Sequence, residues 1–398
     1  MAAPLASIAV VVAPQAAVAQ RAPEPSKEIR LDLLTRYDEN VARSSDALAA
    51  QRGLNGSDVI LSPMLTLDIE HPFGPHRAGI TGQVGYDFYR RNTQLNRERI
   101  NLDANGDLRV GPCFVSPRVR FSRRQSDLGD LAVLGGGFLN IKNTETVQTY
   151  GSELACGRDQ GLRPVVGYEY ERGHNSSFLR EQSDYHSNLY SAGLRYVGPT
   201  IGIISIYARR RDTDFDGLPV PGFGADSYRT TEFGVSYSRN IGSRYKVSGS
   251  VGRTKVESRN PLISDRSGLT WNLRGTALIG TRLQVSLDTV NEFRNNLSSD
   301  AAVNRLKSYG IAADYALTDA LRFNASARIE KQTRDYGFVP PPGTLLDDRR
   351  RLYRVGATYD FGRRTRFGLF AGREERNGNG TLYDYNANNV GMSVGVKF

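Results

Sequence analysis

The sequence lacks the residues and the long runs on which several common protein classes depend. Two cysteines cannot form a disulfide scaffold, and neither the cysteines nor the four histidines are spaced like zinc ligands. Beyond residue 20 the longest nearly apolar run, Leu131 to Ile141, has about a dozen residues and is too short to cross a bilayer as a helix. A charged fraction of 24% beside 39% hydrophobic residues disfavours wholesale disorder.

Glycine and tyrosine are plentiful where methionine and tryptophan are scarce. The chain has 41 Gly and 20 Tyr against 3 Met and 1 Trp, a balance that favours turns and strands. We therefore expect an all-β protein.

The N-terminus indicates export. Residues 1–19 carry no charge, include the apolar stretch Ile8 to Ala13 and end in Ala17-Val18-Ala19, the small residues that a signal peptidase requires. We predict a signal peptide at 1–19 and a short periplasmic segment at 20–26; a disordered Ala-rich tail is the alternative. The absence of Lys or Arg near Met1 departs from the usual leader and puts the position of the start in question. Since an exported protein does not meet nucleic acid, the net charge of +10 does not indicate such a partner.

Side chains alternate between apolar and polar along most of the chain. In 321–332, Leu321, Phe323 and Ile329 alternate with Arg322, Asn324 and other polar residues. This period of two is the pattern of a β-strand, whose successive side chains point to opposite faces. The repeated units are ten to twelve residues long, the length that a tilted strand needs to cross a bilayer.

Connection lengths predict an up-and-down barrel. Short connections such as Asn105-Gly106, Gly198-Pro199, Gly280-Thr281 and 318–320 alternate with long ones at 38–57, 126–142, 211–226, 333–349 and 375–387. Two connections break the rule, a short loop at 91–94 and a long turn at 71–75. We predict a transmembrane antiparallel β-barrel over 27–398 with both termini in the periplasm. We expect eighteen strands, with sixteen as the alternative: 27–37, 58–69, 78–90, 95–104, 114–125, 143–155, 162–172, 187–197, 200–210, 227–239, 244–256, 268–279, 282–293, 305–317, 321–332, 350–361, 364–374 and 388–398.

The last expected strand has a regular apolar face that includes the final residue. Its apolar positions are Val390, Met392, Val394, Val396 and Phe398. This pattern resembles the C-terminal signal that the barrel-assembly machinery reads in outer-membrane proteins. We therefore expect that machinery as a partner and the bacterial outer membrane as the location.

Several short motifs resemble one family. They are Tyr37-Asp38-Glu39-Asn40-Val41-Ala42-Arg43, Gly85-Tyr86-Asp87-Phe88-Tyr89, 123–128 and the Ile241-Gly242-Ser243 turn. They are similar to motifs of the EpsL-like, porin-type outer-membrane barrels associated with exopolysaccharide operons. The resemblance would cover 27–398 and implies a pore or accessory barrel in making or exporting polysaccharide. It implies no catalytic residue, and we expect no cofactor.

The inward positions of the expected strands carry charges of both signs. An eighteen-strand barrel is too wide for side chains to fill, so either a channel or a loop plug must occupy the interior. A water-filled lumen with both signs orients and passes hydrophilic solutes. The alternative is that the charges pair across strands and only solvate the wall. We expect the lumen to be lined by Arg120, Arg274, Arg322, Arg328, Arg354, Arg366, Asp87, Glu232, Asp288, Asp314, Glu330 and Asp360.

Basic residues end the outward apolar face of many strands at the expected extracellular side. A charge facing lipid is tolerated near the interface, and lipopolysaccharide phosphates suit Arg and Lys. The alternative is that these residues stand above the bilayer and keep the loops soluble. The expected lipopolysaccharide belt comprises Arg209, Arg229, Arg253, Lys255, Arg305, Lys307, Lys331, Arg351 and Arg373.

Two further sites follow from the expected strand order. Cys113 and Cys156 would lie on neighbouring strands at the periplasmic end, where thiols oxidise, so we predict a disulfide, with two unpaired cysteines as the alternative. Asp212, Asp214 and Asp216 match the first half of a calcium loop. The twelfth position is Phe223 rather than Glu, so Asp226 would have to replace it, and a solvated acidic loop is the alternative.

Three functions remain from these observations. The first is a porin-like channel for polysaccharide or hydrophilic solutes, and the second is a non-conducting structural or assembly barrel. The third is an outer-membrane hydrolase, for which the candidate bases are His71, His76, His174 and His186. Ser, His and Asp are common loop residues, so we do not expect an enzyme.

Overall fold

A computed structural model describes residues 26–129, 141–220, 224–259, 264–294, 303–335, 345–379 and 383–398. The predicted signal peptide, the apolar run from Leu131 as far as residue 140 and Phe223 lie outside these residues. In the described residues eighteen antiparallel strands form one sheet that closes on itself, which confirms the predicted up-and-down barrel. None of the helices in these ranges is long and apolar enough to span a membrane.

The strands follow the chain around the barrel. Each pairs with the next in sequence, and β18 also pairs with β1. Their bounds are β1 (Ser26–Asp38), β2 (Asp58–Phe73), β3 (His76–Tyr89), β4 (Arg97–Val110), β5 (Cys113–Gln125), β6 (Thr144–Cys156), β7 (Gly161–Asn175), β8 (Tyr185–Gly198), β9 (Gly202–Val220), β10 (Gly224–Ile241), β11 (Tyr245–Ser258), β12 (Arg266–Ile279), β13 (Leu283–Arg294), β14 (Val303–Ala316), β15 (Leu321–Asp335), β16 (Asp347–Phe361), β17 (Thr365–Gly378) and β18 (Tyr385–Lys397). The short helices between the described strands include α1 (Asp46–Gln51), η1 (Thr93–Leu95) and η3 (Phe178–Ser183).

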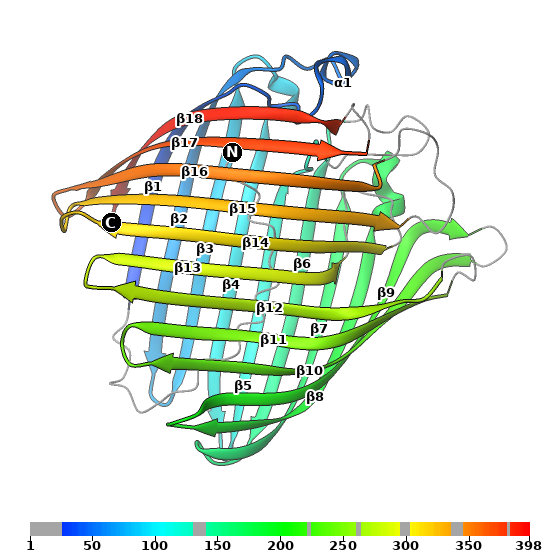
Figure 1. The fold of residues 1–398 in the computed structure, drawn as a ribbon, viewed down its shortest axis with the longest axis vertical. Coiled ribbons are helices and arrows are strands. Elements are labelled where there is room, and N and C mark those ends of the chain that lie inside the picture. Colours follow the sequence, from blue (N-terminus) through cyan, green and yellow to red (C-terminus); the bar gives the residue numbers. More distant parts are fainter. Residues whose placement is uncertain are drawn as a thin grey trace.

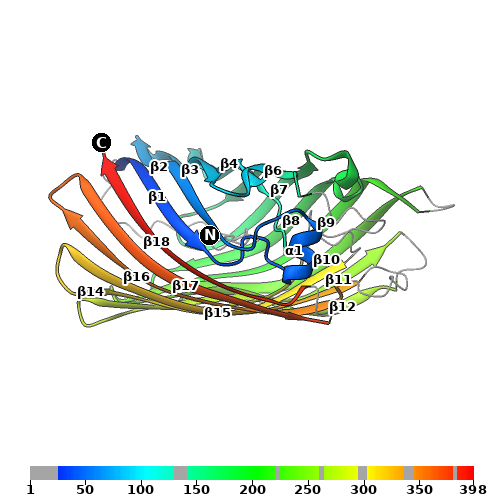
Figure 2. The ribbon, with the colours of Figure 1, turned by 90° about the horizontal axis from the view of Figure 1, so that it is seen from above.

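Strands on opposite walls of the barrel cross each other. In Figure 1 the front wall, β10 to β18, runs across the view while β1 to β8 run upward behind it. Figure 2 shows the barrel from above, wider than it is deep. We call the end with the short connections and both described chain ends the turn end, and the opposite end, which carries α1, the loop end.

The outer face of the barrel is apolar along the middle of the strands. Large side chains at alternate positions are widely exposed, up to 65% for Leu369 and 64% for Phe233. A soluble monomer rarely exposes so continuous an apolar surface, whereas lipid chains would cover it. The buried apolar residues lie elsewhere, chiefly in a cluster that includes Val41, Leu54 and Ile60 near the loop end.

Two expected turns at the turn end are placed differently in the structure. Asn105-Gly106 lies inside β4, paired with Gly79 and Ala78 of β3, and the turn is Gly111-Pro112. Gly111 has a φ of +58°, which glycine adopts most readily. The expected long turn at 71–75 is short, because β2 continues to Phe73 and β3 begins at His76. In both cases pairing with the neighbouring strand outweighs the local turn signal.

The long loop expected at 211–226 is instead a paired extension of β9 and β10. The two strands reach Val220 and Gly224, with a register shift between Ala225 and Ser227. Phe215 and Tyr228 pack at a ring-centroid distance of 5.9 Å within a buried cluster. Burial of these rings explains why the ribbon continues beyond the apolar band.

Candidate functional site

The inner face of the barrel carries all twelve charged side chains that the sequence predicted there. In β15, Phe323 and Ile329 are exposed on the outer face, so the alternate positions Arg322, Arg328 and Glu330 face inward. Residues directly opposite each other on paired strands share a face of the sheet, so the register extends this assignment to neighbouring strands. Arg328 lies opposite Gly310 and Gly310 lies opposite Asp288, so Asp288 also faces inward.

Several of these charges form ion pairs along the wall. Arg328 of β15 reaches over β14 to Asp288 of β13, with an N–O distance of 3.0 Å. The reach depends on Gly310 between them, where a Cβ would lie 2.6 Å from Asp288 Oδ1. Arg120 pairs in the same way with Glu169 across β6, at 3.0 Å. Such pairs hold long side chains flat against the wall and away from the axis. Three other residues expected in the lumen also form ion pairs: Asp360 with Arg366, Asp87 with Arg99, and Glu232 with Arg209.

Other lumen charges have no such partner. Among the described residues, Arg274, Arg322, Asp314 and Glu330 make no ion pair within 4 Å. Arg354 stacks on Phe370 of β17, its guanidinium 4.2 Å from the ring centroid. These side chains are therefore available to hydrated ions or charged solutes in the lumen.

A second group of charges, which the sequence did not predict, lies buried at the loop end. We call it the loop-end cluster: Asp38, Arg43, Asp127, Arg334, Asp348, Arg350, Glu374 and Arg376. Arg43 pairs with Asp38 at 2.7 Å and with Glu374 at 3.2 Å, and its side chain is completely buried. Burial alone would lower the pKa of Arg43, but the carboxylates of Glu374 and Asp38 raise it above the usual value. Its guanidinium therefore stays charged.

The rest of the cluster connects the long connection after β5 to the wall. Arg350 of β16 pairs with Glu374 at 2.6 Å and with Asp127, in the connection after β5, at 3.1 Å. Asp348 pairs with Arg334 and Arg376 at 2.5 and 3.0 Å. Within these eight residues four arginines match four carboxylates, and buried Arg36 adds a further positive charge at 3.9 Å from Asp38. The only sequence signal for this cluster is the concentration of charge at the strand ends.

The connection between β1 and β2 is held in place by this cluster. It contains α1, whose N-cap Ser45 accepts a hydrogen bond from Leu48 N at 3.4 Å. Arg52, just after α1, donates to the Leu128 carbonyl at 2.9 Å. Leu48 packs against Leu345 and Tyr383, which precede β16 and β18. The segment is thus anchored by both charge and apolar contact.

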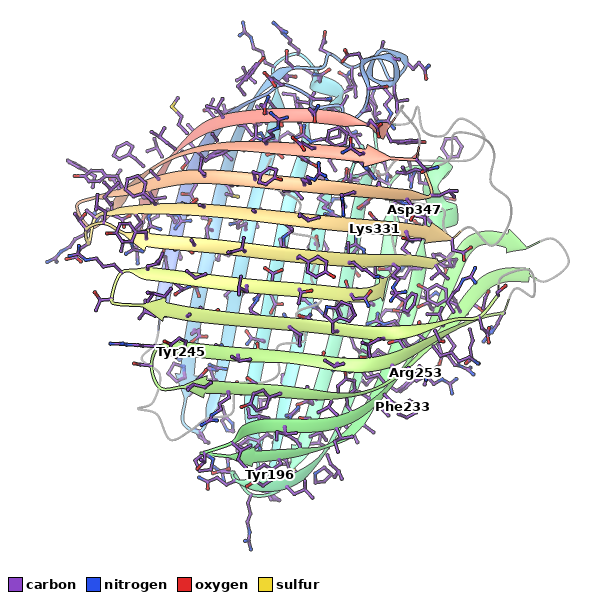
Figure 3. All side chains as sticks on the ribbon, viewed as in Figure 1. Tyr196, Phe233, Tyr245, Arg253, Lys331 and Asp347 are labelled. Atoms are coloured by element: carbon purple, nitrogen blue, oxygen red, sulfur yellow. A yellow bond between two sulfur atoms is a disulfide. The ribbon has the colours of Figure 1, made fainter. Side chains whose placement is uncertain are left out.

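Eight of the nine residues of the expected lipopolysaccharide belt lie on the outer face near the loop end. Figure 3 shows Arg253 and Lys331 at that end of the front wall, and Tyr245 at the turn end. Arg209 was predicted wrongly, because it faces the lumen. Its neighbour Tyr207 is buried and donates its hydroxyl to Glu232 at 2.7 Å, whereas Ile206 is the exposed residue. Both faces of β9 carry apolar residues here, which obscured the period of two.

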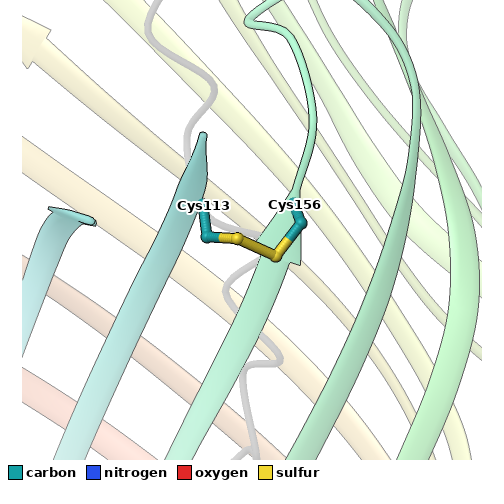
Figure 4. The surroundings of a disulfide bond; sticks show 2 residues. All are labelled: Cys113 and Cys156. Atoms are coloured by element: carbon teal, nitrogen blue, oxygen red, sulfur yellow. A yellow bond between two sulfur atoms is a disulfide. The ribbon is translucent and has the colours of Figure 1, made fainter. Parts of the chain in front are cut away.

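The structure contains the predicted Cys113–Cys156 disulfide (Figure 4). The two residues are in direct register between β5 and β6 at the turn end, with a Cα–Cα distance of 4.0 Å. The bridge encloses a sequence separation of 43 residues.

The predicted calcium loop is wrong. Asp212, Asp214 and Asp216 lie at alternate positions of β9 and do not surround a common point. Asp212 pairs with Arg229 at 2.8 Å, and His186 lies between Asp214 and Asp216. Across the described ranges no group of three His, Cys, Asp or Glu side chains could hold a metal ion.

A closed sheet with an apolar exterior and a charged interior defines a transmembrane β-barrel. No protein-family model matches the chain, and no curated protein sequence matches it either, so the resemblance to EpsL-like barrels rests on its short motifs alone.

The chain is similar to several solved structures, one of which is described as an outer-membrane protein. OccK2 (OpdF) of Pseudomonas aeruginosa, crystallised with glucuronate, is 12% identical and has a TM-score of 0.47, over 94% of this chain and 98% of that one. OprD of the same organism is 13% identical with a TM-score of 0.44, over 94% and 93%. A BenF-like porin from Pseudomonas fluorescens Pf-5 is 14% identical with a TM-score of 0.48, over 94% and 99%. The likeness is one of overall barrel architecture.

Proposed function

We propose that this protein is an outer-membrane channel through which hydrophilic solutes diffuse. The observation that carries the proposal is the lumen wall, where paired charges lie flat and Arg274, Arg322, Asp314 and Glu330 have no ion-pair partner. In the proposed orientation the loop end faces the outside and the turn end faces the periplasm, where the Cys113–Cys156 disulfide would form.

Small charged solutes suit this lumen better than a polysaccharide chain. Sugar rings bind well on exposed aromatic faces, but Tyr185, Tyr207, Phe215 and Tyr228 point inward and are buried. The partly exposed ring of Phe370 is covered by the guanidinium of Arg354. The mixed charges of the wall, by contrast, can replace part of the hydration of an ionised solute. Polysaccharide export is the alternative cargo, and block of ion current by added oligosaccharide would support it.

Planar-bilayer recording tests the proposal. The folded barrel should give stable conductance steps, and the double variant Arg274→Gln, Arg322→Gln should shift the reversal potential in a salt gradient toward cation selectivity. The matched control is Arg253→Gln, whose side chain lies on the outer face and which should leave the reversal potential unchanged. A correctly folded protein that passes no current would overturn the channel.

The second candidate is a non-conducting barrel closed by its loops. The observation that favours it is the loop-end cluster, which holds the connection between β1 and β2 against β16 to β18. If the wild type is silent and a variant that loosens this connection conducts, the barrel is closed at rest.

A further inference from the structure

Three cations form an unbroken row on the outer face near the loop end. Lys307 of β14 lies directly opposite Lys331 of β15, and Lys331 lies directly opposite Arg349 of β16. The next residues in register on either side, Asn291 of β13 and Asn377 of β17, carry no charge. We call Lys307, Lys331 and Arg349 the cationic row.

Several other outward cations at this end have acidic partners, although Arg253 and Arg305 have none among the described residues. Arg229 pairs with Asp212 at 2.8 Å, Lys255 with Glu257 at 2.6 Å, and Arg373 with Glu375 at 2.7 Å. In the part of the chain that the structure describes, the cationic row has no ion pair within 4 Å.

One carboxylate lies beside the row without neutralising it. Asp347 is two residues from Arg349 and on the same face, and Figure 3 shows it near Lys331. Its side chain accepts a hydrogen bond from the Thr333 hydroxyl at 2.8 Å. The positive charge of the row is therefore left for a group from outside the chain.

Like charges directly opposite each other in a sheet repel and destabilise the pairing. An anion lying over a row of three relieves this repulsion, and so does screening by water. The row's position favours the anion, because Lys307 is two residues from exposed Tyr309 and Lys331 two residues from exposed Ile329. The row thus lies at the edge of the apolar band, where lipid headgroups begin.

We propose that the cationic row binds the phosphate groups of lipopolysaccharide in the outer leaflet. Three cations on adjacent strands span about 10 Å, twice the strand spacing, which suits a headgroup with two phosphates better than one with a single phosphate. Arg305 stands beside the row, oriented by Asn291 at 3.0 Å and stacked 5.3 Å from the Phe293 ring centroid. This inference rests on the orientation given under the proposed function.

The test compares lipopolysaccharide binding and thermal stability in three variants. The first replaces the cationic row by glutamine (Lys307→Gln, Lys331→Gln, Arg349→Gln). The matched control replaces three acid-paired cations of the same face (Arg229→Gln, Lys255→Gln, Arg373→Gln). The third is Lys331→Gln alone, which removes the cation that has a cation on each side.

The row variant should bind lipopolysaccharide about tenfold or more weakly than wild type, since one charge-assisted hydrogen bond alone is of that order. The control should bind like wild type. In vesicles without lipopolysaccharide, Lys331→Gln should melt no lower than wild type, because repulsion is relieved, and it should gain less on adding lipopolysaccharide.

Equal binding by the row variant and the control would overturn the inference. The inference would also fail if phosphatidylglycerol vesicles or dephosphorylated lipopolysaccharide stabilised the wild type as much as intact lipopolysaccharide does. Because the row faces lipid, its variant should conduct like wild type. If neither the wild type nor any variant conducts, the proposed function fails, while the comparison of lipopolysaccharide binding still tests the row.

Discussion

Removing the charge of Arg43 should loosen the connection between β1 and β2. Arg43→Met keeps much of the side-chain volume but leaves the carboxylates of Asp38 and Glu374 without the guanidinium between them. Glu374 retains Arg350 at 2.6 Å and the Tyr385 hydroxyl at 2.6 Å. Asp38 keeps only Arg36 at 3.9 Å among its ion pairs. The uncompensated charge is therefore that of Asp38.

The expected loss of unfolding free energy follows from the different partners that Asp38 and Glu374 retain. Breaking a buried ion pair by removing one partner costs about 3–5 kcal/mol. Because Glu374 keeps its other partners, we expect Arg43→Met to cost about 3 kcal/mol, at the low end of that range. Arg351→Met is the matched control, since Arg351 pairs with Glu375 at 3.4 Å on the outer face. Because this pair is partly exposed, Arg351→Met should lower the free energy of unfolding by about 1 kcal/mol or less.

Denaturant unfolding of the barrel in vesicles gives both free energies, and single-channel recording adds a functional readout. Arg43→Met should increase either the conductance or its fluctuations, because the connection that carries α1 loses its anchor. If Arg43→Met costs no more than Arg351→Met and leaves the current unchanged, the loop-end cluster does not hold that connection.

Three further predictions concern the turn end, the lumen wall and the leader. Replacing Cys113 and Cys156 by serine should lower the free energy of unfolding by about 4 kcal/mol for a closed loop of this length, measured by urea unfolding with and without reductant. Gly310→Val should push Asp288 from its partner, cost about 1–3 kcal/mol and alter ion selectivity; an unchanged melting temperature and reversal potential would contradict this. Export of the full chain should remove residues up to Ala19, which intact mass spectrometry of the mature protein would show.

Strand positions could be predicted wherever apolar residues occupy one face only. In β15 the exposed residues Phe323 and Ile329 alternate with polar ones, and both its limits and its inward face agree closely with the prediction. In β9, Ile203, Ile204 and Tyr207 put apolar side chains on both faces, so the period of two did not identify the lumen side. The structure shows that Tyr207 faces the lumen, where its hydroxyl donates a hydrogen bond to Glu232 of the next strand.

The two pairs that tie connections to the wall in the loop-end cluster, Arg43 with Glu374 and Arg350 with Asp127, could not be predicted because their partners are distant in sequence. Arg43 follows β1 and Glu374 lies in β17, near opposite ends of the chain. Asp127 is 223 residues from Arg350. No local period or motif encodes such pairs. They arise only when the sheet has closed and brings the first, fifth and last strands to the same end.

The pairing of β1 with β18 joins the first and last strands and leaves the closed sheet without a free edge. Lys397 reaches Glu28 at 2.8 Å across a sequence separation of 369 residues, and Phe398 donates its backbone N–H to Ile29 at 2.9 Å. Bringing such distant ends together costs about 5 kcal/mol in loop entropy before any seam contact forms. Until then the growing sheet has two unpaired edges, each able to join another chain. An exposed edge of β1 or β18 is therefore a feature shared by every barrel of this chain that has not closed.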